Sequence, residues 1–193
     1  MKKNAKSEKV IDCALGLLEE QGDHGVTMRQ VAQRAEMSLS NVQYYFKNKD
    51  ALLTALADRY FNQCLVEVRE QPVRLSEGNL KAELAAMLRD YLAHGLEISE
   101  MCRIFREYWA IATRNEVIEE YLTNYYRQLG DVVAEKLQPV AVSPEALSMS
   151  VSVIIPFVEG YTITAPSLPK NIDEMTEQLT TIVIRILKDK DSR

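Results

Sequence analysis

Residues 27–46 read TMRQVAQRAEMSLSNVQYYF, and this stretch carries the start signals of two short helices. Thr27 and Gln30 match a capping box, in which the Thr hydroxyl accepts from the amide of Gln30 and the Gln side chain returns to the amide of Thr27. The helix that starts there is expected to end just before residues 36–38, which leave room only for a tight turn. Ser38 can cap a second helix directly after this turn. The stretch therefore predicts two short helices joined by a tight turn.

The helix after Ser38 is expected to have two chemically distinct faces. One face is apolar, and the other presents uncharged groups that form hydrogen bonds. The apolar face comprises Leu39, Val42 and Phe46, and the polar face comprises Ser40, Asn41, Gln43 and Tyr44. Side chains of this second kind read base edges and phosphates in a major groove. The pattern therefore indicates a helix that contacts DNA.

The chain on either side of this stretch continues the helical pattern. Before it, apolar residues from Val10 to Leu18 recur at helical spacing, and Gln21-Gly22 supplies the left-handed residue that commonly ends a helix. After it, Asn48 is expected to cap a further helix, so that Lys49 lies in the first turn. A positive charge there opposes the helix dipole and gains nothing locally. A bound phosphate would explain the lysine.

Three segments of this region together match a family pattern. They are Thr27 to Ala32, Met37-Ser38 and Tyr45 to Leu53. As a set they resemble the DNA-binding domain of the TetR family in the order, spacing and caps of three helices, over roughly residues 8–56. Glu36 stands where the family usually has a turn Gly, and Gln43 where a Tyr is common. These two departures affect the operator sequence and not the fold.

The resemblance implies roles for individual residues. It implies that Thr27, Tyr44 and Lys49 contact phosphates and that Arg29, Asn41 and Gln43 reach base edges. Ser38 and Ser40 complete the expected DNA-binding set. Each role has a plainer alternative. Thr27 can be only a cap, Arg29 and Lys49 can be solvated charges, and Tyr44 can be a packing residue.

Composition agrees with such a protein without proving it. The chain has 193 residues, 47% of them hydrophobic, and a formal net charge of −5. Residues 1–53 carry eight Lys and Arg against seven Asp and Glu, whereas the remainder carries 15 against 21. The acidic part can thus be held away from phosphate, although any solvated helical surface would give similar counts.

Localisation and redox state follow from what the sequence contains. No apolar run approaches the roughly 18 to 20 residues that span a bilayer, and the first residues do not read as a signal peptide. We therefore expect a cytoplasmic protein. Cys13, Cys64 and Cys102 are odd in number and far apart, which fits reduced structural thiols better than a disulfide framework or a zinc site.

Apolar residues at helical spacing continue to the end of the chain, so the expected fold is all-α. The three N-terminal helices are expected to form a helix-turn-helix DNA-binding domain at residues 1–49. Six more helices are expected to form a ligand-binding and dimerisation domain at residues 50–193. A loop is expected around residues 69–79, and another at residues 165–169.

The last two helices have the clearest start signals in this second domain. Ser143-Pro144-Glu145 places a cap before a first-turn proline, and Asn171 with Glu174 resembles a capping box. Pro156 is expected to kink the first of these helices. The run at residues 151–155 could alternatively be a buried strand, but no partner strand exists elsewhere in the sequence, so a helix is favoured.

Dimerisation is expected because one short recognition helix buries too little surface for specific binding. The resemblance implies that the last two helices pack against those of a second subunit. The apolar positions of the last helix recur nearly every 3.5 residues, which suits packing on another helix. The expected interface residues are Val151, Ile155, Leu179, Ile182 and Ile186.

A small-molecule effector is also expected from the resemblance. Aromatic residues are frequent in the segments that enclose the ligand in this family, although each ring could equally pack in a helical core. The expected ligand-binding residues are Tyr91, Phe105, Tyr108, Trp109, Tyr125, Phe157 and Glu159. If Glu159 faces the cavity, a cationic guest between ring faces and one carboxylate becomes an option.

Other classes of function are weaker readings of the sequence. The chain has only two His and seven Gly, with no recognisable catalytic triad, metal-ligand cluster or phosphate-binding glycine loop, so neither an enzyme nor a cofactor is expected. A helical adaptor without operator binding remains an alternative, as does a regulator without an effector.

Overall fold

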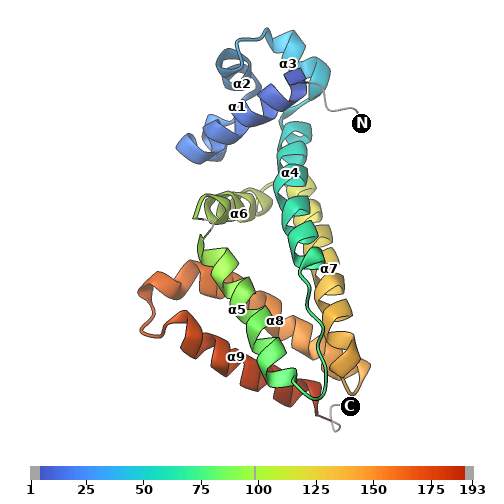
Figure 1. The fold of residues 1–193 in the computed structure, drawn as a ribbon. Helices are drawn as coiled ribbons and strands as arrows, with labels where there is room; N and C mark the ends of the chain where they lie inside the picture. Colours follow the sequence, from blue (N-terminus) through green and yellow to red (C-terminus); the bar gives the residue numbers. More distant parts are fainter. Residues whose placement is uncertain (1–4, 98, 190–193) are drawn as a thin grey trace. The chain divides into compact units, whose positions relative to one another are not determined.

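The computed structural model describes residues 5–97 and 99–189, and the side chains of these residues outside 95–103. The described residues contain helices and no strand, as the sequence predicts (Figure 1). The α-helices are α1 (Ala5–Gln21), α2 (Met28–Arg34), α3 (Leu39–Tyr45), α4 (Lys49–Glu70), α5 (Leu80–Glu97), α6 (Ser99–Ala112), α7 (Glu116–Leu137), α8 (Pro144–Thr164) and α9 (Ile172–Leu187). Three short 3-10 helices join them: η1 (Asp23–Gly25), η2 (Gln138–Val140) and η3 (Ala165–Ser167).

The chain divides into two compact units. The first combines the described part of Met1–Cys64 with Arg103–Tyr125, and the second combines Leu65–Cys102 with the described part of Tyr126–Arg193. The long helices α4 and α7 therefore contribute to both units. The expected functional boundary between residues 49 and 50 is a different division, which stays a prediction.

The N-terminal helices end and begin where local chemistry dictates. Gly22 follows α1 with φ 68°, a left-handed conformation that glycine adopts without a steric penalty. Thr27 caps α2 by accepting from the amide of Gln30. The expected return bond differs, because the Gln30 carboxamide oxygen accepts from the Thr27 hydroxyl at 2.6 Å, whereas the Thr27 amide donates to the carbonyl of Gly25. The predicted capping box is therefore only half formed.

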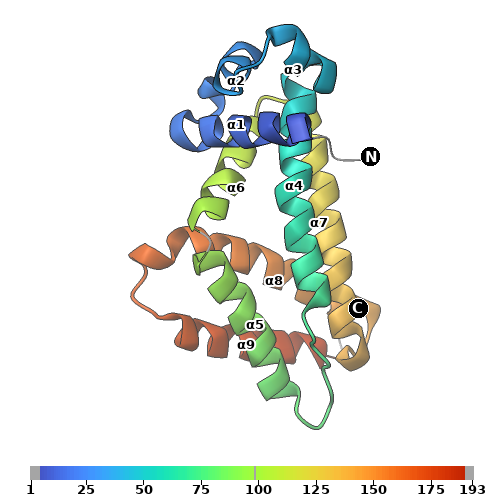
Figure 2. The same ribbon diagram turned by 45° about the horizontal axis from the view of Figure 1, so that its top comes forward.

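The helices of the first unit bury apolar side chains. Val10, Ala14 and Leu18 of α1 are buried, as are Val31 of α2 and Val42 of α3. The N-terminal parts of α4 and α7 run side by side in both views of the ribbon (Figures 1 and 2), and the ring of Phe61 on α4 contacts those of Tyr121 and Tyr125 on α7. The helix-turn-helix is thus held by the apolar faces that the sequence predicts.

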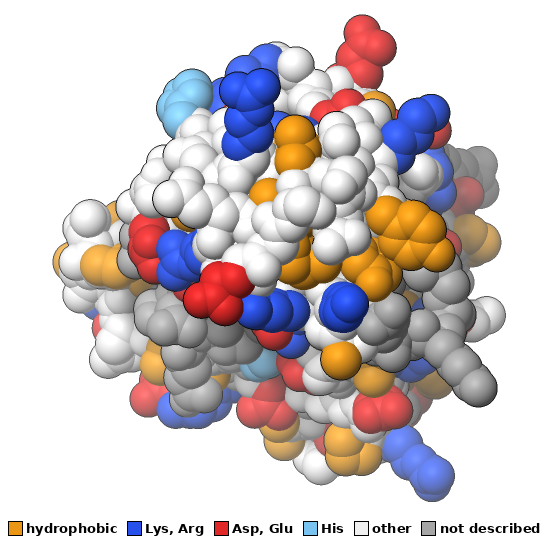
Figure 3. Space-filling view, turned by 90° about the horizontal axis from the view of Figure 1, so that it is seen from above, with side chains coloured by type: hydrophobic (Ala, Val, Ile, Leu, Met, Phe, Trp, Pro, Cys, Tyr) orange, Lys and Arg blue, Asp and Glu red, His pale blue; other side chains and the backbone are white. Residues whose placement is uncertain are grey.

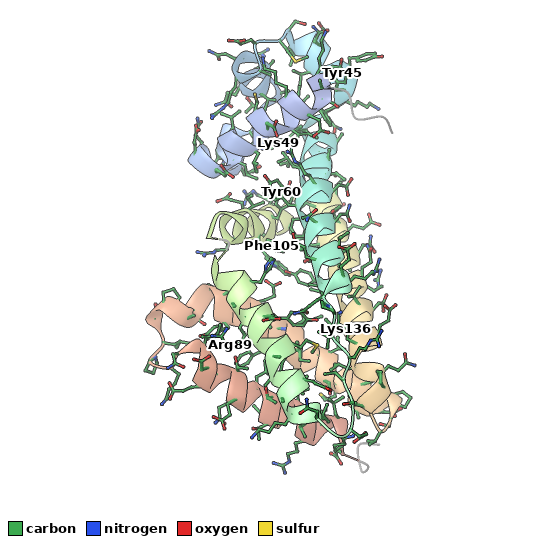
Figure 4. All side chains as sticks on the ribbon, viewed as in Figure 1. Tyr45, Lys49, Tyr60, Arg89, Phe105 and Lys136 are labelled. Carbon is green, nitrogen blue, oxygen red and sulfur yellow. The ribbon has the colours of Figure 1, made fainter. Side chains whose placement is uncertain are left out.

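The second unit is built around α5, α8 and α9, which pack together (Figure 2). Its core is aliphatic and draws residues from these helices and from the C-terminal part of α7. Fully buried members include Leu84, Leu88, Leu137, Leu179, Val183 and Leu187. At its edges Lys136 donates to the carbonyl of Gln71, at 2.8 Å, and Arg89 pairs with Asp173, at 2.9 Å (Figure 4).

The start of α8 and α9 follows the sequence signals. Ser143 caps α8 ahead of Pro144, and Asn171 and Glu174 form a complete capping box for α9. Residues 151–155 lie within α8, so the alternative of a buried strand is wrong. Pro156 is accommodated inside α8. Most of the loop expected at residues 165–169 is the short helix η3.

One expectation about α8 needs correction. The segment Pro144–Ser167 is long and apolar enough to cross a membrane by length and composition, with a mean hydropathy of 1.5. The sequence reading overlooked it because Ser, Thr, Gly and Pro interrupt its apolar residues. One such helix is weak evidence for a membrane span: 22% of the apolar window is buried in this subunit, where α8 packs on α5 and α9.

Candidate nucleic-acid interface and effector site

The polar face of α3 is exposed, as the sequence predicts. Ser38 caps the helix by accepting from the amide of Asn41 at 3.2 Å, and the Ser38 and Ser40 hydroxyls lie 3.0 Å apart. Asn41 and Gln43 are exposed, and Tyr44 is 82% exposed with its ring against that of Tyr45. The alternative that Tyr44 packs in the core is therefore wrong. These uncharged groups lie on one short helix, free to meet a major groove.

The face seen from above carries this chemistry on its surface. Uncharged side chains and backbone cover most of the centre of the view, with several Lys and Arg side chains around them (Figure 3). Arg29 on α2 and Lys47 between α3 and α4 are both exposed. In the described part of the chain neither has an ion pair or a hydrogen bond from its side chain. Their charges are available to an external anion.

Lys49 has a partner that the sequence reading did not find. Its ammonium lies 2.6 Å from Oδ1 of Asp23 and also donates to the Asp23 backbone carbonyl, at 2.8 Å. The expectation that this charge gains nothing locally is therefore wrong. The partner lies 26 positions earlier in the chain, beyond any argument from the helix that contains Lys49.

Asp23 is the centre of a small ionic network in the first unit. Its Oδ2 lies 3.1 Å from the guanidinium of Arg114, and its amide donates to Glu107, at 3.3 Å. Burial alone would raise the pKa of Asp23, but the hydrogen bonds from Lys49 and Arg114 outweigh it and hold the pKa below its ordinary value. The carboxylate is therefore ionised and joins η1 to α4 and to the end of α6.

Three of the predicted ligand-binding rings lie together in the first unit. Phe105, Tyr108 and Tyr125 all contact the ring of Phe61, with centroid distances of 4.3, 5.3 and 4.7 Å. Tyr108 is fully buried, and its hydroxyl donates to the carbonyl of Leu53 at 2.6 Å. Tyr108 is thus a core residue, the alternative role that the sequence left open for each ring. Phe105 on α6 stays partly accessible (Figure 4).

Trp109 follows Tyr108 in the sequence, but its side chain is not buried. Its exposed fraction is 50%. It is the only tryptophan of the chain, so its emission would report specifically on α6.

The other predicted ligand-binding residues belong to the second unit. Tyr91 and Phe157 pack partly buried against its core, and the buried hydroxyl of Tyr91 has no hydrogen-bond partner among the described residues. Glu159 on α8 is only partly accessible. Burial raises the pKa of Glu159, although a hydrogen bond from Tyr126 opposes this change. The Tyr91 hydroxyl is thus a buried polar group of this unit that a ligand could satisfy.

The sequence reading missed Phe61 and Tyr126. Phe61 lies on α4, and its ring is fully buried. The buried positions Leu53 and Ala57 precede Phe61 at intervals of four, and this spacing could have identified it. Tyr126 carried no comparable signal, because its role depends on a hydrogen bond to α8.

The predicted dimer residues are not equally placed. Ile182 is 46% exposed, and Val151, Ile155 and Ile186 are partly buried. Leu179 is fully buried within the core of its own subunit, so it has no surface to offer a partner. Two further exposed apolar side chains on α8 are Met149, at 55%, and Ile163, at 52%.

Comparison with known proteins gives a consistent family. A model described as "Bacterial regulatory proteins, tetR family" matches residues 10–56. An uncharacterised HTH-type transcriptional regulator in the dhlA 5′ region of Xanthobacter autotrophicus is 57% identical over 192 residues. The alignment covers 100% of this chain and 95% of that relative.

Solved structures share the fold. Salmonella enterica GusR superposes with a TM-score of 0.74 at 17% identity, covering 98% of each chain. The multidrug binding protein EbrR in complex with malachite green superposes with a TM-score of 0.66 at 22% identity, covering 96% of this chain and 100% of EbrR. SmeT in complex with triclosan has a TM-score of 0.67 at 15% identity, covering 97% and 94%. The close relative spans the whole chain, and the family model matches the helix-turn-helix, so this protein belongs to the TetR family of HTH-type transcriptional regulators.

Proposed function

We propose that this regulator is a cytoplasmic, dimeric repressor that binds a near-palindromic operator and leaves it when a small molecule binds. The single observation that carries the proposal is the exposed polar face of α3, which follows a capped turn in a helix-turn-helix. Side chains of this kind recognise bases without the desolvation cost of buried charge. The expected base contacts are Arg29, Asn41 and Gln43. Thr27, Ser38, Ser40 and Tyr44 are expected to contact the sugar-phosphate backbone of the DNA, and the family resemblance implies the same of Lys49.

The DNA part of the proposal is tested on the DNA upstream of the protein's own gene. A footprint of purified protein should protect a symmetric site whose halves lie one helical turn apart, roughly 34 to 36 Å. Protection at that spacing supports two α3 helices in successive major grooves. An adaptor without operator activity would protect no site.

Dimerisation is supported by the exposed apolar surface of α8 and α9. Met149, Ile163 and Ile182 are each about half exposed in the single subunit. Such side chains gather where a partner covers them. The proposed interface therefore comprises Val151, Ile155, Ile182 and Ile186 of the predicted set, with Met149 and Ile163 added and Leu179 left to the subunit core.

Two observations support release from DNA by an effector: a buried hydroxyl without a hydrogen-bond partner, and the ligands bound by proteins of the same fold. EbrR binds malachite green and SmeT binds triclosan, a cationic dye and a neutral aromatic compound. In this chain the buried Tyr91 hydroxyl has no partner among the described residues, and the Glu159 carboxylate, which accepts from Tyr126, stays partly accessible. We propose an aromatic effector, and a cationic one if the carboxylate takes part.

Thermal melting tests the effector proposal, because a ligand that binds only the folded protein must raise the melting temperature. Malachite green and triclosan serve as the first probes. A cationic site is supported if malachite green raises the melting temperature of the wild type but not of Glu159→Gln. A regulator without an effector would show no shift with any aromatic compound and no release from DNA.

A compound that releases the operator should also change the emission of Trp109. Release without any change in that emission, together with unchanged affinity in Trp109→Phe, would place the effector away from α6.

A further inference from the structure

The positive charges of the first unit fall into two groups according to their partners. Arg34 pairs with Glu20 at 2.5 Å, Arg59 with Asp12 at 2.5 Å, and Lys9 with Glu36 at 3.6 Å. Lys49 and Arg114 share Asp23. Arg29 and Lys47, by contrast, are exposed and have no side-chain partner in the described part of the chain. Arg106 on α6 is likewise exposed and unpaired in the described part of the chain, so within the helix-turn-helix the charges that can meet phosphate without first breaking a contact are those of Arg29 and Lys47.

Lys49 would have to give up two interactions to reach a phosphate. Its ammonium bridges the Asp23 carboxylate and the Asp23 carbonyl, and the carboxylate is only 14% exposed. Breaking this contact would leave a poorly solvated carboxylate with half its pairing lost. The carboxylate would also repel an approaching phosphate. Lys49 is thus more favourably paired with Asp23 than with a phosphate of the DNA.

The same contact holds the connection between α1 and α2, ahead of the helix-turn-helix. Asp23 is the first residue of η1, a three-residue 3-10 helix within this connection. Its carboxylate is held from one side by Lys49 in the first turn of α4 and from the other by Arg114, whose guanidinium also donates to Ala110 at the end of α6. Its amide is held by Glu107. The placement of α2, and with it α3, therefore depends on Asp23.

We propose that Asp23 is a positioning residue for DNA binding. Its contact with Lys49 joins η1 to the start of α4 and leaves the nearby phosphate contacts to Arg29 and Lys47. This inference rests on the proposed operator binding. It reverses the role that the family resemblance implies for Lys49. The contact between Asp23 and Lys49 sets the orientation of α3, so its loss reduces recognition of the operator sequence rather than attraction to the DNA backbone.

Lys47→Met and Lys49→Met separate the two roles, because a phosphate contact and a positioning contact change different quantities. Binding to the operator and to a scrambled duplex is measured at several salt concentrations. Lys47→Met should weaken both duplexes by the same factor and reduce the salt slope by about 0.9. Lys49→Met should weaken the operator alone, by about tenfold, and leave the salt slope unchanged. Equal loss on both duplexes with a reduced slope in Lys49→Met would overturn the proposal.

A double-mutant cycle tests whether Asp23 is the partner through which Lys49 acts. Asp23→Asn should lower the ratio of operator affinity to scrambled-duplex affinity, as Lys49→Met does. The double variant should lower this ratio no further than the single variant that lowers it more. Additive losses would show that Lys49 acts elsewhere. Lys49→Arg, which keeps a cation in reach of Asp23, should recover the ratio lost in Lys49→Met.

Two controls keep the outcomes distinct. Far-ultraviolet circular dichroism melts identify the temperature at which every variant is folded, and binding is compared there. If the wild type itself does not prefer the operator, the proposed function fails. If the wild type prefers it and Lys49→Met retains the full ratio, only the inference about Asp23 and Lys49 fails.

Discussion

Glu36 holds the tightest point of the turn between α2 and α3, and it is the only described non-glycine residue with a positive φ, at 55°. A side chain in this left-handed region costs roughly 1 to 2 kcal/mol, which glycine avoids. The turn keeps this conformation because the helix caps on either side fix its neighbours. The ion pair of Glu36 with Lys9, at 3.6 Å and mostly exposed, offsets little of the conformational cost.

Glu36→Gly should therefore stabilise the protein by about 0.5 to 1 kcal/mol, since glycine relieves the strain but loses more entropy on folding. Chemical denaturation measures this change. Glu36→Ala is the matched control, because alanine removes the same ion pair and keeps the strain. A Glu36→Gly variant no more stable than Glu36→Ala would contradict the account of this turn.

Individual side chains were predictable from the sequence where their role is local. Thr27, Ser38 and Asn48 each accept from an amide three positions later, and a cap of this kind is visible in the sequence. Lys49 was not predictable, because its partner is set by the packing of η1. The burial of Phe61 was predictable from its spacing after Leu53 and Ala57, although its ring partners on α6 and α7 were not.

Helix α4 begins at the contact between Lys49 and Asp23, and this contact gives the element a pH dependence. The pKa of Asp23 lies below its ordinary value in the folded protein, because the hydrogen bonds from Lys49 and Arg114 outweigh burial. A depressed carboxyl pKa contributes stability that is present above the unfolded value, roughly 3.9, and is lost as the pH falls through the folded value.

The free energy of unfolding of Asp23→Asn should accordingly lie below that of the wild type at neutral pH, by about 1 kcal/mol, because solvent screens the partly exposed Lys49 and Arg114. The gap should narrow only below about pH 4. Denaturant titrations of both proteins from pH 3 to 7 measure it. A gap that stays constant down to pH 3 would mean that the carboxylate has no special role.

Helix α8 should confer a pH dependence on effector binding, through a carboxyl pKa that is raised where that of Asp23 is lowered. Burial raises the pKa of Glu159, so part of this group is neutral at pH values where an exposed glutamate is ionised. The affinity for a cationic probe should therefore rise with pH as Glu159 ionises, and it should be flat in Glu159→Gln. An affinity independent of pH in the wild type would remove Glu159 from the site.

The elements themselves were largely predictable, because caps, periodic apolar residues and turn residues act over a few positions. Ser143 and the Asn171–Glu174 box mark α8 and α9 correctly. The 3-10 helices η1 and η3 were not predicted, since three residues give no periodicity. Assignment of α9 side chains to a partner failed for Leu179, because a repeat of 3.5 residues does not say which of two neighbours an apolar face meets.

Assembly of two subunits is the property of the complete protein that its own surface predicts. Ile182→Glu should place a charge in the proposed interface and yield monomers that no longer bind the operator. Val117→Glu is the matched control, since Val117 on α7 is similarly exposed, at 49% against 46% for Ile182. Sedimentation should show monomers for the first variant and dimers for the second. Dimers in both would place the interface elsewhere.

Organisation of the complete chain was harder to predict than its elements. The sequence suggests a division after residue 49, whereas the first compact unit combines the helix-turn-helix with part of α4, with α6 from Arg103 on and with the start of α7. Contacts such as Tyr108 with Leu53 and Arg114 with Asp23 join residues 55 and 91 positions apart. No local pattern in the sequence encodes such pairs.

Operator selectivity is the measurement that tests the central claim most directly. Fluorescence anisotropy at one fixed salt concentration compares the wild type and Gln43→Ala on the upstream operator and on a scrambled duplex. We predict that the wild type prefers the operator by at least about 10³-fold. Gln43→Ala should lose roughly 1 to 3 kcal/mol on the operator and nothing on the scrambled duplex. Equal affinity of the wild type for both duplexes would contradict sequence-specific binding through α3.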